Sequence, residues 1–196
     1  MRREPVQERS QARIEFLLET AETLILEQGL AALSIREVAR LADTNIATFY
    51  QFFPSRKALI RRIVEKYQAL LQSELQGAIE QGLRAELHDA LDRVQSTMFK
   101  FYRDNPVTLE IWPGTNSDPE LRALDQRDTQ ENADAFAAVV TQFRPDAARE
   151  DARAAALLIV LSAGNILRHA VSLKARQRNK ILRMNITATM ALIQSL

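Results

Sequence analysis

The 196-residue sequence contains no cysteine, which excludes disulfide bonds and thiolate metal sites. Glycine and proline are scarce, with five and six residues, and this favours long helices over sheets with many turns. The longest near-continuous apolar run, residues 154–163, is shorter than the roughly 20 residues that span a bilayer. No apolar segment follows the charged start, so we expect no signal peptide. These absences favour an all-α cytoplasmic protein without a membrane segment.

Charge is nearly balanced overall, at +1, but it is unevenly distributed. Residues 34–62 hold six arginine or lysine residues against two acidic ones, a net charge of +4. The rest of the chain after this window is close to neutral. A local excess of positive charge supplies salt-dependent affinity for nucleic acid that does not depend on its sequence.

The same window predicts two short helices joined by a tight turn. Ser34 and Glu37 have the spacing of a capping box, in which each side chain bonds the backbone N–H of the other. Apolar residues then follow at helical spacing, ending at Ala42. Asp43 and Thr44 interrupt the pattern, and we expect a turn there. This first helix is therefore short.

Asn45 is a good N-cap for the second helix. Phe49 and Phe53, one turn apart, would anchor that helix to a core, and Pro54 ends it. Two short helices joined in this way form a helix-turn-helix, in which the second helix enters the major groove of DNA.

Ser55 caps the helix that follows, with Arg56 and Lys57 in its first turn. Cations at a helix N-terminus oppose the helix dipole. A bound phosphate would remove that conflict, because the free N–H groups and the dipole attract anions. A solvated pair of charges on an ordinary helix is the alternative, and these two residues alone do not decide between them.

The run from Ile35 to Leu59 resembles the DNA-binding segment of the tetracycline-repressor (TetR) family of bacterial transcriptional regulators. The matching landmarks are Thr48-Phe49-Tyr50, Phe53, Ser55, Arg56 and Leu59, preceded by Ile35, Val38 and Ala39. A helix ending near Gly29 precedes them, as the family's first helix does. The remaining two-thirds of the chain resembles the family only in the number and placement of helices.

The resemblance implies roles for individual residues. Thr48, Tyr50 and Arg56 would contact phosphates, while base edges would face Asn45, Ile46, Ala47 and Gln51. The expected DNA-binding residues are Ser34, Asn45, Ile46, Ala47, Thr48, Tyr50, Gln51, Arg56 and Lys57. Three positions depart from the family pattern: Asp43 replaces the usual turn glycine, Thr44 a buried aliphatic residue, and Phe52 a common histidine. Aspartate tolerates a left-handed turn, so we expect the turn to survive.

Ile46 has two competing interpretations. Helical spacing places it with Phe49 and Phe53 on one apolar face, which predicts a core residue. The family pattern places it at the DNA, where an aliphatic side chain can contact a thymine methyl group. We favour the DNA contact, because the first turn of a recognition helix points toward the bases.

The rest of the chain predicts further helices in a second domain. We expect a DNA-binding domain at residues 1–55 and a helical effector-binding and dimerisation domain at residues 56–196. Counted from the helix that ends near Gly29, the helix capped by Ser55 is the fourth. Gly77 and Gly82 would bracket its end, and Trp112-Pro113-Gly114 would stop a short sixth helix. Asp118-Pro119 opens a seventh, and Arg144-Pro145-Asp146 separates it from the last two.

We expect a homodimer interface at those last two helices, largely because of the resemblance and because a dimer is needed to read a palindromic site. Residues 154–167 are apolar nearly all round, so that helix should be buried on more than one side. The final helix places Leu182, Ile186, Thr189, Met190 and Ile193 on one face. Two helices from each subunit would form a four-helix bundle about a twofold axis. Packing within one monomer alone is the alternative.

An effector site is expected from the resemblance, around Phe99, Tyr102, Glu110 and Trp112. Aromatic residues with one carboxylate suit an apolar or cationic ligand, although aromatic residues at helical spacing are more often core. The sequence has no phosphate loop, nucleophile motif or metal-ligand spacing, so we expect no catalytic residue, no metal and no cofactor. A purely structural bundle would explain the helical pattern but not Thr48, Tyr50 and Arg56. The resemblance therefore implies a repressor that a small molecule releases from a palindromic, inverted-repeat operator.

Overall fold

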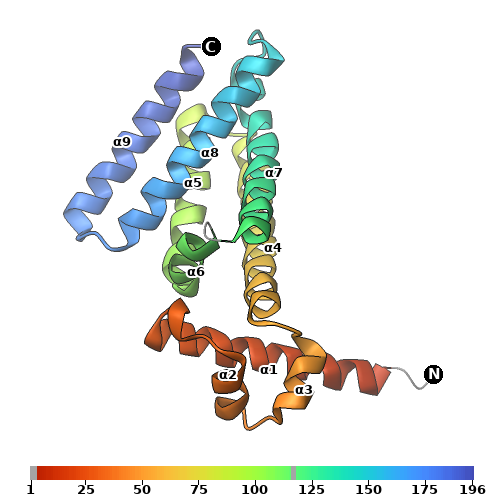
Figure 1. The fold of residues 1–196 in the computed structure, drawn as a ribbon. Coiled ribbons are helices and arrows are strands. Elements are labelled where there is room, and N and C mark those ends of the chain that lie inside the picture. The colour runs from red at the N-terminus through yellow and green to blue at the C-terminus, as the bar shows by residue number, and fades with distance from the viewer. Residues whose placement is uncertain (1–3, 116–117) are drawn as a thin grey trace. The chain divides into compact units, whose positions relative to one another are not determined.

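The computed structural model describes residues 4–115 and 118–196, and every regular element in these ranges is helical (Figure 1). The predicted all-α class is therefore confirmed. The elements are α1 (Glu4–Gln28), a 3-10 turn η1 (Leu30–Ala32), α2 (Ile35–Leu41), α3 (Ile46–Phe52), α4 (Arg56–Gly82), α5 (Leu87–Asp104), α6 (Val107–Thr115), α7 (Pro119–Phe143), α8 (Arg149–Val171) and α9 (Ala175–Gln194).

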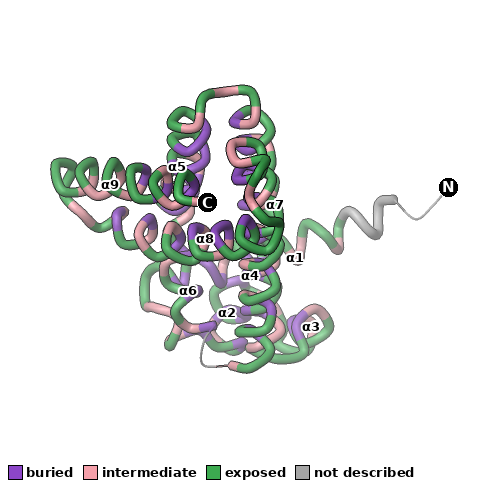
Figure 2. Tube along the Cα trace, turned by 90° about the horizontal axis from the view of Figure 1, so that it is seen from above, coloured by how far each residue is buried: buried purple, intermediate pink, exposed green. Residues whose placement is uncertain are grey.

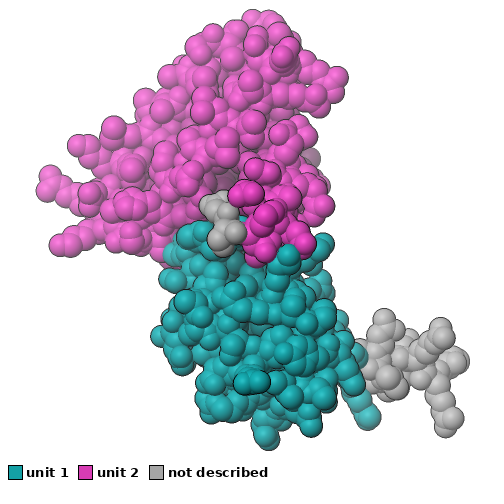
Figure 3. Space-filling view, viewed as in Figure 1, with its two compact units in different colours: residues 1–67, 106–117 teal, residues 68–105, 118–196 magenta. Residues whose placement is uncertain are grey.

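The chain divides into two compact units (Figure 3). Unit 1 comprises Met1–Tyr67 and Pro106–Ser117, and unit 2 comprises Gln68–Asn105 and Asp118–Leu196. The long helix α4 contributes its first half to unit 1 and its second half to unit 2. Helix α6 belongs to unit 1, although α5 and α7 on either side of it in sequence belong to unit 2. The predicted boundary between residues 55 and 56 separates a DNA-binding from an effector-binding domain. The two compact units are defined by contacts instead, so that boundary stays a prediction.

Unit 1 is built on α1, which packs against η1, α2 and α6. Apolar residues at helical spacing along α1 are fully buried at Leu17, Ala21 and Leu24. The helix ends at Gln28, and Gly29 has a φ of 80°, a conformation that a residue without a Cβ adopts at little cost. The N–H of Gly29 donates to Ile25 O at 2.8 Å. The predicted stop at Gly29 is confirmed.

The predicted end of α6 is wrong. The helix does not stop at Trp112-Pro113-Gly114 but continues to Thr115, with Pro113 inside its last turn. A proline so close to the end of a short helix removes a single backbone hydrogen bond. Trp112 and Thr115 on either side of it are buried, and the Thr115 hydroxyl donates to Trp112 O at 2.7 Å. This packing holds the last turn in place.

Unit 2 is organised around α8, which packs against α5, α7 and α9. The predicted start of α7 is confirmed: Asp118 is its N-cap and Pro119 its first residue. The Asp118 carboxylate accepts hydrogen bonds from the N–H groups of Glu120 and Leu121 at 2.9 and 3.2 Å. The predicted ends of α4 at Gly82 and of α7 before Arg144 are confirmed as well.

Within the chain, α8 is buried along one stripe rather than nearly all round (Figure 2). Ala156 and Leu167 are fully buried, but Leu158 and Leu161 are 55% and 48% exposed. The prediction of burial on more than one side is therefore not met by one copy of the chain. Among the described residues, α8 is also the one helix whose length and composition would suffice to cross a membrane. A helix in the core of a protein that does not enter a membrane meets the same criterion, so one such helix is weak evidence for a membrane span.

Candidate nucleic-acid interface

Helix α2 begins as the capping pattern predicts, but only half of the box forms. The hydroxyl of Ser34 accepts a hydrogen bond from the N–H of Glu37 at 3.2 Å. The Glu37 carboxylate does not return to Ser34; it accepts two bonds from Arg40, at 2.5 and 3.1 Å. These hydrogen bonds lower the pKa of Glu37 below its usual value. The reciprocal bond fails because the guanidinium of Arg40, one turn away, is the stronger donor.

The turn between α2 and α3 takes the shape that Asp43 was expected to allow. Its φ is 45°, the left-handed region that the usual glycine would occupy. Thr44 is half-buried, and its hydroxyl donates to Ala42 O at 3.1 Å and accepts a bond from Arg13 of α1. A polar side chain therefore replaces the usual aliphatic one without leaving its hydroxyl unpaired.

Helix α3 is anchored by one face and exposed on the other. Asn45 caps it, accepting a bond from the N–H of Ala47 at 2.8 Å. Phe49 is fully buried and Phe53 is 3% exposed, with ring centroids 5.4 Å apart. Both predictions, the cap and the aromatic anchor, are confirmed. The remaining side chains of this short helix are therefore held in a fixed orientation by a packed core.

All nine predicted DNA-binding residues are accessible to solvent. Ile46 is 38% exposed and Tyr50 is 49% exposed, whereas Thr48 and Lys57 are half-buried. The interpretation of Ile46 as a core residue is therefore wrong, because its side chain is exposed. Its contact with DNA stays a prediction. The exposed members of the set are Ser34, Asn45, Ile46, Ala47, Tyr50, Gln51 and Arg56.

Helix α4 starts at Arg56, and the Ser55 hydroxyl accepts a bond from the N–H of Ala58 at 3.1 Å, as predicted. Arg56 itself is engaged in an unexpected way. Its Nε donates to Leu33 O and its Nη2 to Leu30 O, both at 2.7 Å. The sequence led us to expect either a phosphate contact or a solvated charge at Arg56. Hydrogen bonds to backbone carbonyls are neither of these. The phosphate contact stays a prediction, but two of the five donors of the side chain are already used.

Ion pairs offset part of the positive charge of this region. Arg40 is paired with Glu37, and Arg61 is 2.8 Å from Glu65, one helical turn along α4. In each pair the arginine is exposed and the glutamate is half-buried, so salt still screens the pair and each contributes little to stability.

A buried polar cluster fastens α1 to α4 within unit 1. Glu22 is 9% exposed and accepts bonds from Lys66 Nζ at 2.7 Å and from the Tyr67 hydroxyl at 2.9 Å. Burial and the Glu22 carboxylate raise the pKa of Tyr67 far above its usual value. The phenol therefore remains a donor at any physiological pH, and it holds Glu22 in place.

The four predicted effector residues divide between the units. Phe99 and Tyr102 belong to unit 2, where the guanidinium of Arg178 lies 5.5 Å from the Phe99 ring and that of Arg168 lies 5.8 Å from the Tyr102 ring. Glu110, which is exposed, and Trp112, which is buried, belong to unit 1. Their role in ligand binding stays a prediction.

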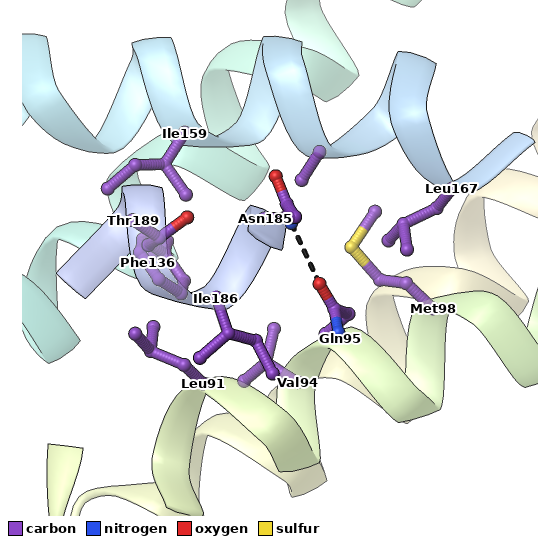
Figure 4. Close-up of a pocket in the computed structure, with 11 residues that line it drawn as sticks. Leu91, Val94, Gln95, Met98, Phe136, Ile159, Leu167, Asn185, Ile186 and Thr189 are labelled. Carbon is purple, nitrogen blue, oxygen red and sulfur yellow. Dashed lines mark hydrogen bonds between the residues drawn. The ribbon is translucent and has the colours of Figure 1, made fainter. Parts of the chain in front are cut away.

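Two hollows lie among the described residues of unit 2, and none of these four residues lines either. One is a cavity of about 30 Å³ among α5, α7, α8 and α9, with room for about one water molecule (Figure 4). Its wall is apolar except for Gln95, Asn185 and Thr189. Asn185 Nδ2 donates a hydrogen bond of 2.8 Å to Gln95 Oε1 (Figure 4). Sequence patterns give no signal for this pair, because the two residues are 90 positions apart.

The second hollow is a groove of about 350 Å³ between α4 and α7. It is lined by Gln72, Leu75, Gln76, Ile79, Glu131, Asn132 and Ala135. Beside it lies Asp128, whose carboxylate accepts bonds from Gln72 at 3.1 Å and Asn132 at 3.1 Å. Burial, with the neighbouring carboxylates of Asp125 and Glu131, raises the pKa of Asp128 to about 6.

Comparison with known proteins finds matches along most of the chain. Residues 17–63 match the family described as bacterial regulatory proteins, tetR family. Residues 85–185, more than half of the chain, match the tetracyclin repressor-like C-terminal domain.

The individual proteins that resemble this chain share less than 30% of its sequence over the matched residues. The uncharacterized HTH-type transcriptional regulator Rv1255c of Mycobacterium tuberculosis is 28% identical over 57% of this chain and 54% of its own length. The HTH-type transcriptional regulator EthR of Mycolicibacterium smegmatis is 27% identical over 69% of this chain and 62% of its own. The chain thus spans less than two thirds of either relative. A transcriptional regulator of Rhodococcus sp. Rha1 superposes with a TM-score of 0.73 over 93% of this chain and 96% of its own, at 17% identity, which shows the fold alone.

Proposed function

Because this chain belongs to the tetR family of bacterial regulatory proteins, we propose that it is a sequence-specific, DNA-binding transcriptional repressor. The observation that carries the proposal is α3, a short helix whose Phe49 is buried while its first turn is exposed. An exposed helix anchored from one side is what the major groove of DNA can admit. Asn45, Ile46, Ala47 and Gln51 are its proposed contacts with base edges.

Contacts with the DNA backbone are proposed for Ser34, Thr48, Tyr50 and Lys57. Hydroxyl and ammonium groups are common donors to DNA phosphates, and such contacts fix the register of a protein on the duplex. The exposed cation Arg36 of α2 adds to the field that attracts DNA. Affinity should accordingly fall as salt rises.

We propose that the protein acts as a homodimer through α8 and α9. Leu158 and Leu161 on α8, and Met184 on α9, are 55%, 48% and 60% exposed in the single chain. Large exposed apolar side chains on neighbouring helices are typical of an interface. Ala154 and Ala188, also exposed, are small enough to let helices of a second copy approach closely. A twofold dimer would read the two halves of an inverted repeat.

Release of the operator by a small molecule completes the proposal. Pockets for such ligands commonly measure about 300–1,000 Å³. The groove between α4 and α7 is within this range, and the Glu131 carboxylate beside Leu75 and Ile79 suits an apolar molecule with a positive charge. Since α4 runs through both units, a ligand that prefers one position of this helix would shift the spacing of the two recognition helices. The proposed location is the cytoplasm, where the operator lies.

The test is retardation of DNA from the region upstream of the gene, compared with random DNA of equal length at two salt concentrations. We expect one fragment to be bound more tightly than random DNA at both, with weaker binding of each at the higher salt. If every fragment is bound no better than random DNA, the proposal fails.

A further inference from the structure

The guanidinium of Arg56 is bonded to backbone that precedes it by 23 and 26 residues. Both bonds, to Leu33 O and Leu30 O, measure 2.7 Å, which is short for an N–H···O hydrogen bond and typical of a charged donor. The two carbonyls lie at the start of turn η1 and just after its end. We call this pair of bonds the Arg56 clamp.

The clamp joins the two ends of the helix-turn-helix. Leu33 directly precedes Ser34, the N-cap of α2, and its side chain is only 2% exposed. Arg56 follows α3 after a gap of three residues, and Phe53 in that gap is 3% exposed. The segment that leads into α2 is therefore tied to the residue at which the chain leaves α3. A change at the clamp would alter how α2 is held against α1 and, because α3 packs against α2, where α3 lies.

Helix α6 packs against η1, the segment whose carbonyl Arg56 holds at Leu30. A Cβ added to Gly114 of α6 would overlap Cδ2 of Leu30. Gly114 thus lets α6 pack closely against the residue whose carbonyl Arg56 holds. The atom that would be overlapped is the end of the Leu30 side chain, so the close contact concerns that side chain and not the Leu30 carbonyl itself.

We propose that Arg56 is a positioning residue of the DNA interface: it holds η1 and the start of α2 in place, so that α3 presents its side chains to the bases in register. The proposal rests on the proposed function of DNA binding. It assigns Arg56 an effect on base preference, whereas the family resemblance assigns it a phosphate contact. A phosphate contact strengthens binding to every DNA sequence alike and adds about 0.9 to the slope of log affinity against log salt.

The decisive variant is Arg56→Lys, which keeps the charge but replaces a planar fork with a single ammonium group that cannot bond both carbonyls in the same way. We expect its preference for the upstream fragment over random DNA to fall about tenfold, with the salt slope unchanged. The matched control is Lys57→Gln, in the same helical turn, which should lower the slope by about 0.9 per subunit and leave the preference unchanged.

Hydrogen exchange tests the clamp without DNA. The N–H of Leu33 donates to Leu30 O at 3.2 Å, within the clamped segment. We expect its exchange to be about tenfold faster in Arg56→Lys than in the natural protein, and unchanged in Lys57→Gln. Binding by Arg56→Lys that equals the natural protein's on both DNAs, or unchanged exchange at Leu33, would overturn the proposal. Should the natural protein prefer no fragment, the proposed function fails, while exchange at Leu33 still decides on the clamp.

Discussion

At the scale of single residues, adjacent positions on α3 have different proposed tasks. Tyr50 and Gln51 are both exposed on the same short helix, but only one of them is proposed to face the bases. A hydroxyl bonded to phosphate carries no sequence information, while an amide bonded to a base edge does. Variants at these two positions should therefore affect DNA binding in different ways.

Tyr50→Phe should weaken binding to the operator and to random DNA by a similar factor, about fivefold for a loss of about 1 kcal/mol. Gln51→Ala should weaken binding to the preferred base pair by about 1–3 kcal/mol and leave random DNA nearly unaffected. The measurement is a titration of each variant against the operator and against single base-pair changes of it. Equal effects of both variants on every DNA would contradict this division.

Asp128 makes the stability of unit 2 depend on pH. Its pKa in the folded protein is about 6, against an ordinary value of 3.8, because burial and the carboxylates of Asp125 and Glu131 disfavour the ionised form. Between these values the folded state binds more protons than the unfolded state, so the free energy of unfolding falls as pH rises from about 4 to about 6. Above that range both states are ionised and the loss is constant.

Asp128→Asn removes this titration while keeping the size of the side chain. We expect the free energy of unfolding of the variant, relative to the natural protein, to rise by about 2 kcal/mol between pH 4 and pH 7, at about 1.4 kcal/mol for each unit of pKa. Urea unfolding at several pH values measures it. Asp134→Asn, on the exposed face of the same helix, controls for loss of a surface charge. A difference that does not change with pH would show that Asp128 is not the titrating group.

Sequence alone identified the caps and the aromatic anchor of the interface, because Ser34, Asn45 and Phe49 act on neighbours within one helical turn. It could not identify the partners of Arg56, since the Leu30 and Leu33 carbonyls are brought to it by the fold. Backbone carbonyls are common to all residues and leave no pattern in a sequence. Ile46 shows the opposite case, in which helical spacing predicted the core and knowledge of the family pattern favoured the exposed position found here.

At the scale of elements, helix ends were predicted well where a local signal marks them. Asp118 and Pro119 start α7, and Gly29 ends α1. The end of α6 was missed because tertiary packing outweighs the usual effect of proline: the buried residues Trp112 and Thr115 keep Pro113 inside the helix. The groove between α4 and α7 was also missed, since its lining comes from two helices about 50 residues apart in sequence.

The cap at Asp118 offers a quantitative test for α7. Asp118→Ala leaves the N–H groups of Glu120 and Leu121 without their acceptor, and we expect a loss of about 1 kcal/mol in the free energy of unfolding. Asp118→Asn retains an acceptor oxygen and should lose less than half as much. Urea unfolding of the three proteins checks the order. A loss as large in Asp118→Asn as in Asp118→Ala would point to the charge of Asp118 rather than to its cap.

At the scale of the whole molecule, the outer face of α8 and α9 carries large apolar side chains that a single copy of the chain leaves exposed. Much of α9 is exposed in the single chain (Figure 2). The sequence predicted burial of α8 on more than one side, and one copy of the chain meets this on one side only. A second copy that covers Leu158 and Leu161 would reconcile the prediction with the structure. Stable interfaces bury about 800 Å² on each partner, which two helices of about 20 residues can supply.

The double variant Leu158→Glu with Leu161→Glu tests this arrangement directly. Both side chains are exposed in the single chain, so the fold of the monomer should survive, whereas burying the carboxylates in an interface costs several kcal/mol for each ion. We expect a dimer for the natural protein and a monomer for the variant in sedimentation equilibrium, with an unchanged helical circular dichroism spectrum. Operator affinity should fall sharply, because a monomer reads one half-site. Leu70→Glu, an exposed leucine of α4, is the matched control and should remain dimeric. A variant that stays dimeric would place the interface elsewhere.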